Sequence, residues 1–298
     1  MKKAQALAII LYFTCAFCQA EKKTSLSLSP HIGFTFGQLD EILYAPDGSI
    51  RSLLEWEEKP LINIGLSADL ELNNFSIISS FEYGTKIANP QMYDSDWSDG
   101  IKYSYTTHPL ESSKEINAGL QLAYKLLSKT FISLSPAIEL QYMYDSFNSG
   151  TGSGTRNDRQ IRVNKVDYSR HTLFTFTGIK INSDINKYIS LKAAFFISPY
   201  TFQYARDYHH GTKEPYPFTA LELQDCFFSK YKFAATFSWH FTKLFTLDFY
   251  SNVIFGGTDK GTYFSDYYRD EIVRITDQQT GSKLFSTKFG IATTFKFF

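Results

Sequence analysis

The sequence predicts an all-β fold: a ten-stranded antiparallel transmembrane β-barrel with long extracellular loops. Three observations predict it: an export signal at the N-terminus, apolar and polar residues that alternate along the chain, and connections that are short at one end of the strands and long at the other. Aromatic residues also make up 17% of the 298 residues. This content is typical of a wall that spreads its lipid contact over many strands.

Residues 1–20 have the features of a secretory signal peptide. A short basic start precedes an apolar run over residues 4–17, and residues 18–20 supply small side chains at the positions that a signal peptidase reads. The run is too short and wrongly flanked for a spanning helix. A lipoprotein signal is the alternative because two cysteines lie here, but neither follows the small aliphatic residues typical of lipidation. We therefore expect export of residues 21–298 as one barrel domain.

The charge balance and the cysteine count of the sequence indicate which partners and which stabilising cross-links can be excluded. The chain has 30 basic and 30 acidic residues, and removal of residues 1–20 takes away two lysines and no acid. No basic excess remains, which argues against nucleic acid as a partner. Cys226 is then the one remaining cysteine, so no intramolecular disulfide is expected. Beyond the signal, no apolar run approaches the roughly 20 residues that a membrane helix needs.

Alternation with a period of two recurs along the mature chain, as in residues 61–72 and 173–181. From it we expect ten strands, at residues 25–44, 51–72, 75–93, 113–127, 130–147, 167–181, 187–206, 219–240, 244–260 and 283–298. The connections after even strands are short, at residues 73–74, 128–129, 182–186 and 241–243. Most connections after odd strands are long and polar, at residues 94–112, 147–166, 207–218 and 261–283. This asymmetry is typical of an outer-membrane barrel, whose closure leaves no unpaired sheet edge in lipid.

Two long connections carry acidic residues and histidine where a strand reaches the rim. Asp94 and Asp96 end the third strand, and Asp207 and His209 end the seventh, so the two pairs are expected to face each other across the mouth. Residues two apart in an extended segment point the same way. A histidine held by a carboxylate can draw a proton from water, and of two neighbouring carboxyls one tends to stay protonated. We therefore expect a water molecule between His209 and Asp94 to attack a peptide carbonyl.

Spacing alone leaves other interpretations of these residues open. An Asp-x-His sequence arises by chance in polar loops, so a motif match is only a hypothesis. Asp94, Asp96 and Asp99 with Gly100 also resemble a calcium loop, although the later bidentate glutamate is missing. The sequence contains no zinc pattern, Gly-rich phosphate loop or Ser nucleophile elbow. We therefore expect neither a metal nor a cofactor.

The segments Asp94-Ser95-Asp96-Trp97 and Asp207-Tyr208-His209 resemble the two facing rim segments of the omptin family of outer-membrane proteases, which form ten-stranded barrels. Residues 33–44, 52–56 and 107–109 are similar to further family segments, so the likeness spans the mature chain at low identity. The resemblance implies an aspartic-type endopeptidase with Asp94, Asp96, Asp207 and His209 as its catalytic set on the extracellular rim. It also implies that Glu41 helps to hold a basic substrate side chain.

The chain departs from the family pattern at the positions that set specificity. Typical members have a second acid two residues before the Asp of the Asp-x-His segment, and here Ala205 stands there, followed by Arg206. Ser104 replaces the Asp of the family's Trp-Thr-Asp-x-Ser-x-His-Pro signature. The resemblance therefore implies a weak or absent preference for Arg or Lys. Residues 140–144 lack the Glu and Arg of the family's lipopolysaccharide-binding strand, which argues against dependence on lipopolysaccharide, as does His171 in place of another Arg.

Two functions from different classes follow. The favoured one is an outer-membrane endopeptidase that lies in outer-membrane lipid and cleaves peptide or protein substrates at the cell surface with activated water. The alternative is a non-enzymatic adhesin or receptor that binds through its long loops. The intact set of four residues favours the first, and the changed specificity positions favour the second. A general pore is disfavoured because side chains largely fill a ten-stranded barrel.

Overall fold

The structure is a computed structural model that describes residues 24–129, 131–211, 217–267 and 271–297. The predicted signal peptide at residues 1–20 lies outside the described residues. Within them, no helix is long and apolar enough to cross a membrane.

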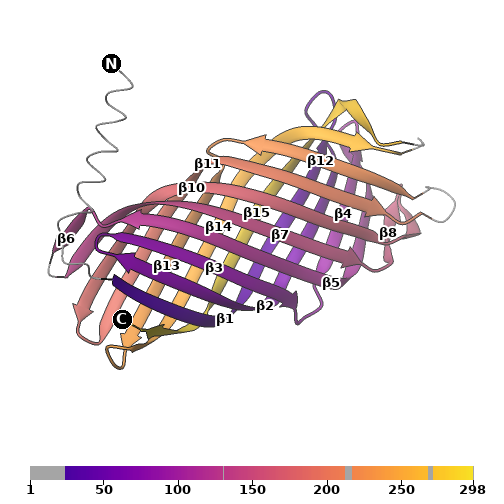
Figure 1. Ribbon diagram of the computed structural model, residues 1–298. Coiled ribbons are helices and arrows are strands. Elements are labelled where there is room, and N and C mark those ends of the chain that lie inside the picture. The colour runs from indigo at the N-terminus through magenta and orange to yellow at the C-terminus, as the bar shows by residue number, and fades with distance from the viewer. Residues whose placement is uncertain (1–23, 130, 212–216, 268–270, 298) are drawn as a thin grey trace, which may run out of the picture.

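Ten antiparallel strands form a closed hydrogen-bonded ring (Figure 1). In order around the ring they are β1 (Thr24–Tyr44), β2 (Ile50–Leu72), β3 (Phe75–Lys86), β5 (Ile101–Tyr124), β7 (Ile132–Ser149), β10 (Val166–Asn186), β11 (Ile189–His209), β13 (Lys230–His240), β14 (Phe245–Ser265) and β15 (Val273–Lys296). The last strand pairs with the first along sixteen residue pairs and so closes the ring. The prediction of a ten-stranded antiparallel barrel is confirmed.

Five further strands lie at the two ends of this ring. Strand β4 (Gln91–Ser98) continues the line of β3, and β12 (Phe218–Cys226) continues the line of β13, each after a short non-strand segment. Strands β8 (Gly152–Arg156) and β9 (Arg159–Val163) form a hairpin beside β5. All four lie toward one end of the barrel, which we call the mouth, and β6 (Leu127–Lys129) lies at the other end (Figure 1).

Several segments that were predicted as connections are therefore strands. Residues 101–110 belong to β5 and pair with β4, because neighbouring extended segments satisfy each other's backbone donors and acceptors. At the opposite end, Ser128 and Lys129 pair with β7 as part of β6, and residues 182–186 belong to β10. The short connections at residues 73–74 and 241–243 do lie outside strands.

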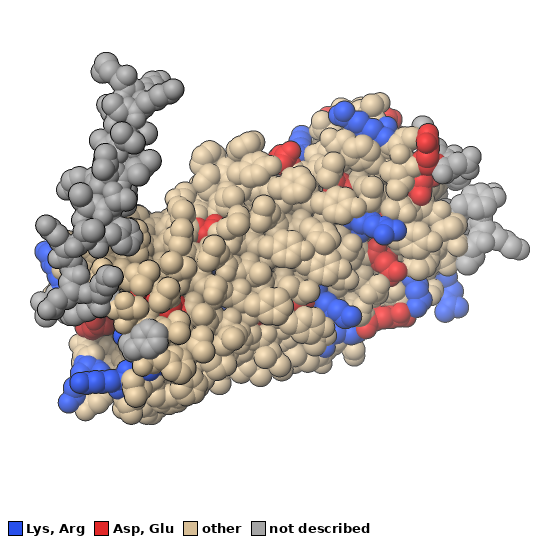
Figure 2. Space-filling model, in the orientation of Figure 1, with Lys and Arg blue, Asp and Glu red and all other residues tan. Residues whose placement is uncertain are grey.

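A band of apolar side chains covers the outer face of the ring. Its members are more than a third exposed and come from ten different strands, as Phe34, Ile64, Phe81, Leu120, Leu140, Ile181, Phe195, Phe233, Phe249 and Phe289 show. Charged side chains gather toward the ends of the molecule, and a broad uncharged band lies between them (Figure 2). An apolar band of this kind is the lipid-facing surface of a membrane barrel.

On the mouth side of this band the outer face becomes polar. Gln38 of β1 donates to Asp40 at 2.7 Å and to Glu55 of β2 at 3.0 Å. On the far side of the ring, the Tyr200 hydroxyl donates to Asp225 at 2.6 Å. These outward-facing acids mark the upper limit of the lipid-facing band, and the strands continue beyond them toward the mouth.

Beneath the mouth, the interior of the barrel is filled by a layer of aromatic side chains, which we call the aromatic layer. Trp56 stacks on Tyr168 with ring centroids 5.3 Å apart and on Phe147 at 5.4 Å. All three side chains are at most 2% exposed. Below them, a polar cavity opens toward the end that carries β6 and is lined in part by Asn73 and Lys129.

Candidate active site

Asp94 and Asp96 lie on β4 and face the interior of the mouth. Asp94 is opposite Leu54 of β2 and Thr106 of β5, and both of these side chains are buried inside the barrel. Residues that are directly opposite in neighbouring strands share a face, so Asp94 points inward. Asp96 follows two positions later on the same strand and therefore points the same way.

Asp207 and His209 lie at the mouth end of β11, on the opposite wall. His209 Nε2 lies 2.5 Å from Oδ2 of Asp207, whose side chain is buried. The imidazole ring also stacks on Phe218 of β12, with ring centroids 4.2 Å apart and an angle of 9° between the planes. The carboxylate keeps the proton on Nε2, which leaves Nδ1 as the basic nitrogen. The ring is thus held in one orientation by two neighbours.

The two walls are close enough to influence each other's protonation. The pKa of Asp94 is raised to about 7, mainly by burial and then by the charge of Asp96, although the charge of His209 lowers it. Burial alone lowers the pKa of His209, but the charges of Asp207, Asp94 and Asp96 outweigh this effect and the pKa is raised. The structure therefore brings together all four predicted catalytic residues.

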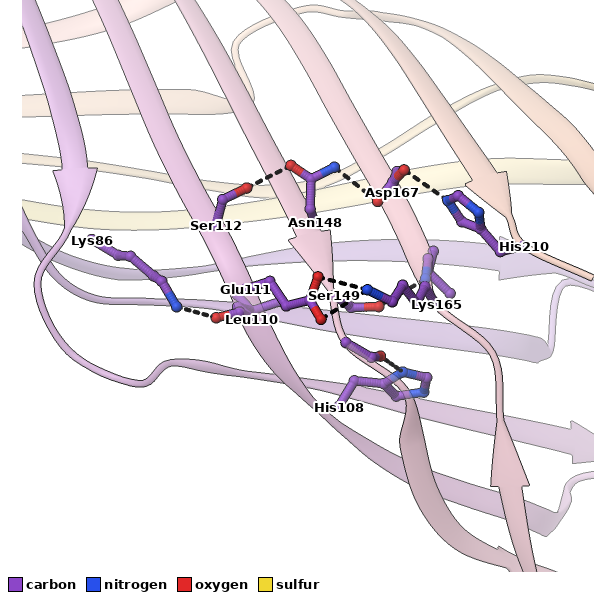
Figure 3. A network of polar contacts seen from close by, with 12 residues as sticks. Lys86, His108, Leu110, Glu111, Ser112, Asn148, Ser149, Lys165, Asp167 and His210 are labelled. Carbon is purple, nitrogen blue, oxygen red and sulfur yellow. Dashed lines mark hydrogen bonds and ion pairs between the residues drawn. The ribbon is translucent and has the colours of Figure 1, made fainter.

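His210 points away from this group. Its Nε2 lies 2.8 Å from Oδ2 of Asp167, which also accepts a hydrogen bond from Asn148, and Asn148 accepts one from Ser112 (Figure 3). This chain of contacts links the middle of β5 to the mouth ends of β7, β10 and β11 and so fixes the rim. Although His210 is adjacent in sequence, it belongs to a structural network and not to the site.

Glu41 lies on β1 with its side chain buried, and it has an acidic neighbour that sequence reasoning missed. Glu222 of β12 is 1% exposed and shares a hydrogen bond with the Glu41 carboxyl group. Burial and the charge of Asp207 raise the pKa of Glu222 to about 8, and burial raises that of Glu41 well above its ordinary value. Glu222 is also directly opposite Ala205, the position where the family's second acid is absent. Alternation along β12 indicates that Glu222 faces inward, but nothing in the sequence links it to Glu41.

Ser104 lies on the other wall, beside the two aspartates. It is directly opposite Asp96 of β4 on one side and Arg156 of β8 on the other. Burial raises the pKa of Asp96, whereas hydrogen bonds from Ser52 and Ser104 and the charge of Arg156 lower it. Arg206, which follows Ala205 on β11, is exposed on the outer face and does not enter the mouth.

The residues of the possible calcium loop do not converge. Asp99 is exposed at the turn between β4 and β5, with a left-handed φ of 51°, whereas Asp94 faces inward. Within the described ranges, one group of carboxylates, formed by Glu58, Glu115 and Asp145, has ligand atoms within 4.8 Å of one another. Cationic side chains already accompany it, since Arg170 binds Asp145 at 2.9 Å and Lys288 binds Glu115 at 2.9 Å.

Comparisons with known proteins relate this geometry to a family. A model of the Omptin family matches residues 22–286. The outer membrane protease OmpT from Escherichia coli has a similar structure, with a TM-score of 0.81 and 16% sequence identity, covering 94% of this chain and 100% of that one. At this identity the likeness establishes the fold alone.

Other matches are weaker. The outer membrane protein OprG from Pseudomonas aeruginosa has a TM-score of 0.36 and 8% identity, covering 91% of this chain and 95% of that one. The toluene transporter TodX from P. putida has a TM-score of 0.34 and 7% identity, covering 92% of this chain and 90% of that one. Neither overlap carries an argument. No curated protein sequence matches the chain.

Proposed function

This chain belongs to the omptin family of outer-membrane β-barrels, as its rim segments predicted, and on that premise we propose that it is an aspartic-type endopeptidase. The observation that carries the proposal is the carboxylate-held His209 on one wall of the mouth, with Asp94 and Asp96 on the other. Its substrates are peptides or proteins, and the mouth faces the outside of the cell. No metal or cofactor takes part in the proposed reaction.

In the proposed mechanism, a water molecule lies between His209 and Asp94. His209 Nδ1 takes a proton from this water as the oxygen attacks the peptide carbonyl carbon, and Asp207 stabilises the imidazolium that forms. Asp94 and Asp96 hold one proton between them at neutral pH, since the pKa of Asp94 is raised to about 7. That carboxyl donates to the oxygen on which negative charge develops. The imidazolium then protonates the leaving amine, which breaks the carbon–nitrogen bond.

Glu41 and Glu222 form the proposed pocket for a basic substrate side chain. Two buried carboxyl groups that share a hydrogen bond form an environment that favours a cation. Glu222 is directly opposite Ala205, so the acid that is absent from β11 is replaced from the neighbouring strand. We therefore propose a preference for Arg or Lys, instead of the weak or absent preference that the resemblance implied.

The outer face beside the mouth is where outer-membrane lipid is proposed to contact the rim. His171 lies there among aromatic residues, and its Nδ1 is 2.7 Å from the Tyr142 hydroxyl. Tyr144 and Tyr204 flank the same ring, with centroids 4.8 and 5.9 Å away. An aromatic cluster without a basic partner suits the lipid interface. This observation supports independence from lipopolysaccharide.

The test is incubation of the refolded full chain with a mixed peptide library, followed by mass spectrometry of the cut sites. His209→Ala is expected to lower cleavage by at least ~100-fold, because it removes the positioned base. His210→Ala is the matched control, since this neighbour faces Asp167 on the outer face, and it is expected to cleave as the wild type does.

Absence of any cut by the wild type would refute the endopeptidase and favour the alternative function. That alternative is a non-enzymatic adhesin or receptor, and the observation in its favour is the loss of acids at Ala205 and Ser104. Full activity in His209→Ala would leave an endopeptidase with a different base.

A further inference from the structure

The mouth has a basic corner on the wall opposite the Glu41–Glu222 pocket. Arg156 of β8 is directly opposite Ser104, whose side chain is buried inside the barrel, so Arg156 shares the inward face of that wall. The hairpin turns through Asn157 and Asp158, both with positive φ of 48° and 60°. Arg159 is opposite Arg156 across this turn and therefore lies on the same face. We call Arg156 and Arg159 the basic corner.

Both guanidinium groups of the basic corner are available to a ligand. The two arginines are exposed, and together with Asn157 and Ile161 they line one pocket at the rim. In the part of the chain that the structure describes, neither arginine has an ion pair. Asp96 is the acid nearest to them in the strand register, but Ser104 lies between it and Arg156. The hydrogen bonds of Asp96 come from Ser52 and Ser104.

We infer that the basic corner binds an acidic side chain of the substrate, on the opposite side of the scissile bond from the basic side chain. This inference rests on the proposed function and deepens it. A peptide held for attack between His209 and Asp94 crosses the mouth from one wall to the other. One flank then faces Glu41 and Glu222, and the other faces the basic corner.

The chemistry at the basic corner suits a carboxylate. Guanidinium groups bind carboxylates with two parallel hydrogen bonds, and a planar donor pair is more selective than a point charge. The neutral Ser104 is part of this arrangement, because an acid at that position would lie beside Arg156 and neutralise it. The Glu41–Glu222 pocket and the basic corner thus carry opposite charges, and the selected substrate carries opposite charges on the two sides of the bond that is cut.

The test compares kcat/KM of the refolded full chain on fluorogenic peptides that differ only in the two residues around the scissile bond: Arg-Asp, Asp-Arg, Arg-Asn and Arg-Lys. The better of the two peptides with opposite charges is expected to exceed Arg-Asn by at least about tenfold, as one charge-assisted contact implies. Arg-Lys is expected to be cleaved more slowly than Arg-Asn, because its second cation meets Arg156 and Arg159.

Arg156→Glu should reverse this order, so that Arg-Lys is cleaved faster than either peptide with an acid. The control is Arg162→Glu, which makes the same change of charge on the same hairpin. Arg162 is opposite Ser153, on the face of β8 that points away from Ser104 and Arg156, so its variant should keep the wild-type order. Heat-modified migration of both variants on gels shows whether they fold.

Each outcome separates the two proposals. Cleavage of Arg-Lys as fast as the best acidic peptide would overturn the inference while the endopeptidase stands. The same effect from Arg162→Glu as from Arg156→Glu would also overturn it, because a diffuse field and not a binding corner would then set the order. If the wild type cleaves none of the peptides, the proposed function fails and the inference fails with it.

Discussion

Replacing Glu222 with glutamine tests the pocket that the sequence did not reveal. The variant keeps the shape of the side chain and removes one of the two carboxylates that are proposed to face a substrate guanidinium. Loss of one charge-assisted hydrogen bond costs about 1.5–3 kcal/mol. That range corresponds to roughly a tenfold to hundredfold lower kcat/KM on an Arg peptide.

The assay is the ratio of kcat/KM for two peptides that carry either Arg or citrulline, its uncharged isostere, at the cleavage site. Glu222→Gln should lower this ratio because only the charged peptide loses a contact. Asp225→Asn is the matched control: Asp225 lies three residues further along β12, faces outward and accepts a hydrogen bond from Tyr200. An unchanged ratio in Glu222→Gln would show that the basic side chain is bound elsewhere.

The same substitution should stabilise the barrel, and this effect depends on pH. The pKa of Glu222 is raised to about 8 in the folded chain, above its ordinary value of 4.5, so the folded state holds the proton more tightly. The carboxyl therefore disfavours folding above pH 4.5, increasingly up to about pH 8. Glu222→Gln should raise the midpoint of thermal unfolding in detergent at pH 8, with little change at pH 4. An equal gain at both pH values would contradict the assigned burial.

Three further predictions concern protonation, metals and the barrel interior. Cleavage of a neutral peptide should fall as the pH drops through the raised pKa of His209, because the base becomes protonated; a profile that is flat from pH 5 to pH 9 would exclude His209 as the base. Treatment with a chelator should leave kcat/KM unchanged, since Asp94 and Asp99 do not converge, and activity that returns only with calcium would refute this. Trp56→Ala should introduce ion conductance in a planar bilayer that the wild type lacks, and a silent variant would show that other side chains close the interior.

The sequence was sufficient for the ring of strands and for the position of the catalytic candidates. Alternation gives the face of each residue, and the spacing of short connections gives the strand count. The Asp-x-Asp and Asp-x-His segments each lie within one strand, so their shared direction follows from local geometry. Their meeting across the mouth follows from the number of strands between them.

Glu222 and Arg156 could not be predicted because their neighbours depend on pairing between segments. Glu222 lies opposite Ala205 only because β12 pairs with β11 as a strand separate from β13. Arg156 lies beside Ser104 because a hairpin within the predicted long connection at residues 147–166 pairs with β5. A shift of one residue in either register would turn these side chains to the other face. The backbone pairing of the long connections was missed for the same reason.

The aromatic layer separates the interior of the barrel into two compartments, the mouth above it and the lower cavity beneath it. Trp56, Phe147 and Tyr168 are buried, and none of them lines the lower cavity, so the aromatic layer lies between that cavity and the mouth. We therefore expect the protonation of Asp94 and His209 to follow the pH of the medium above the mouth. In the proposed reaction, a cleaved peptide would leave through the mouth, by which it entered. Such a barrel is compatible with a membrane that must exclude solutes, because its interior does not form a continuous channel.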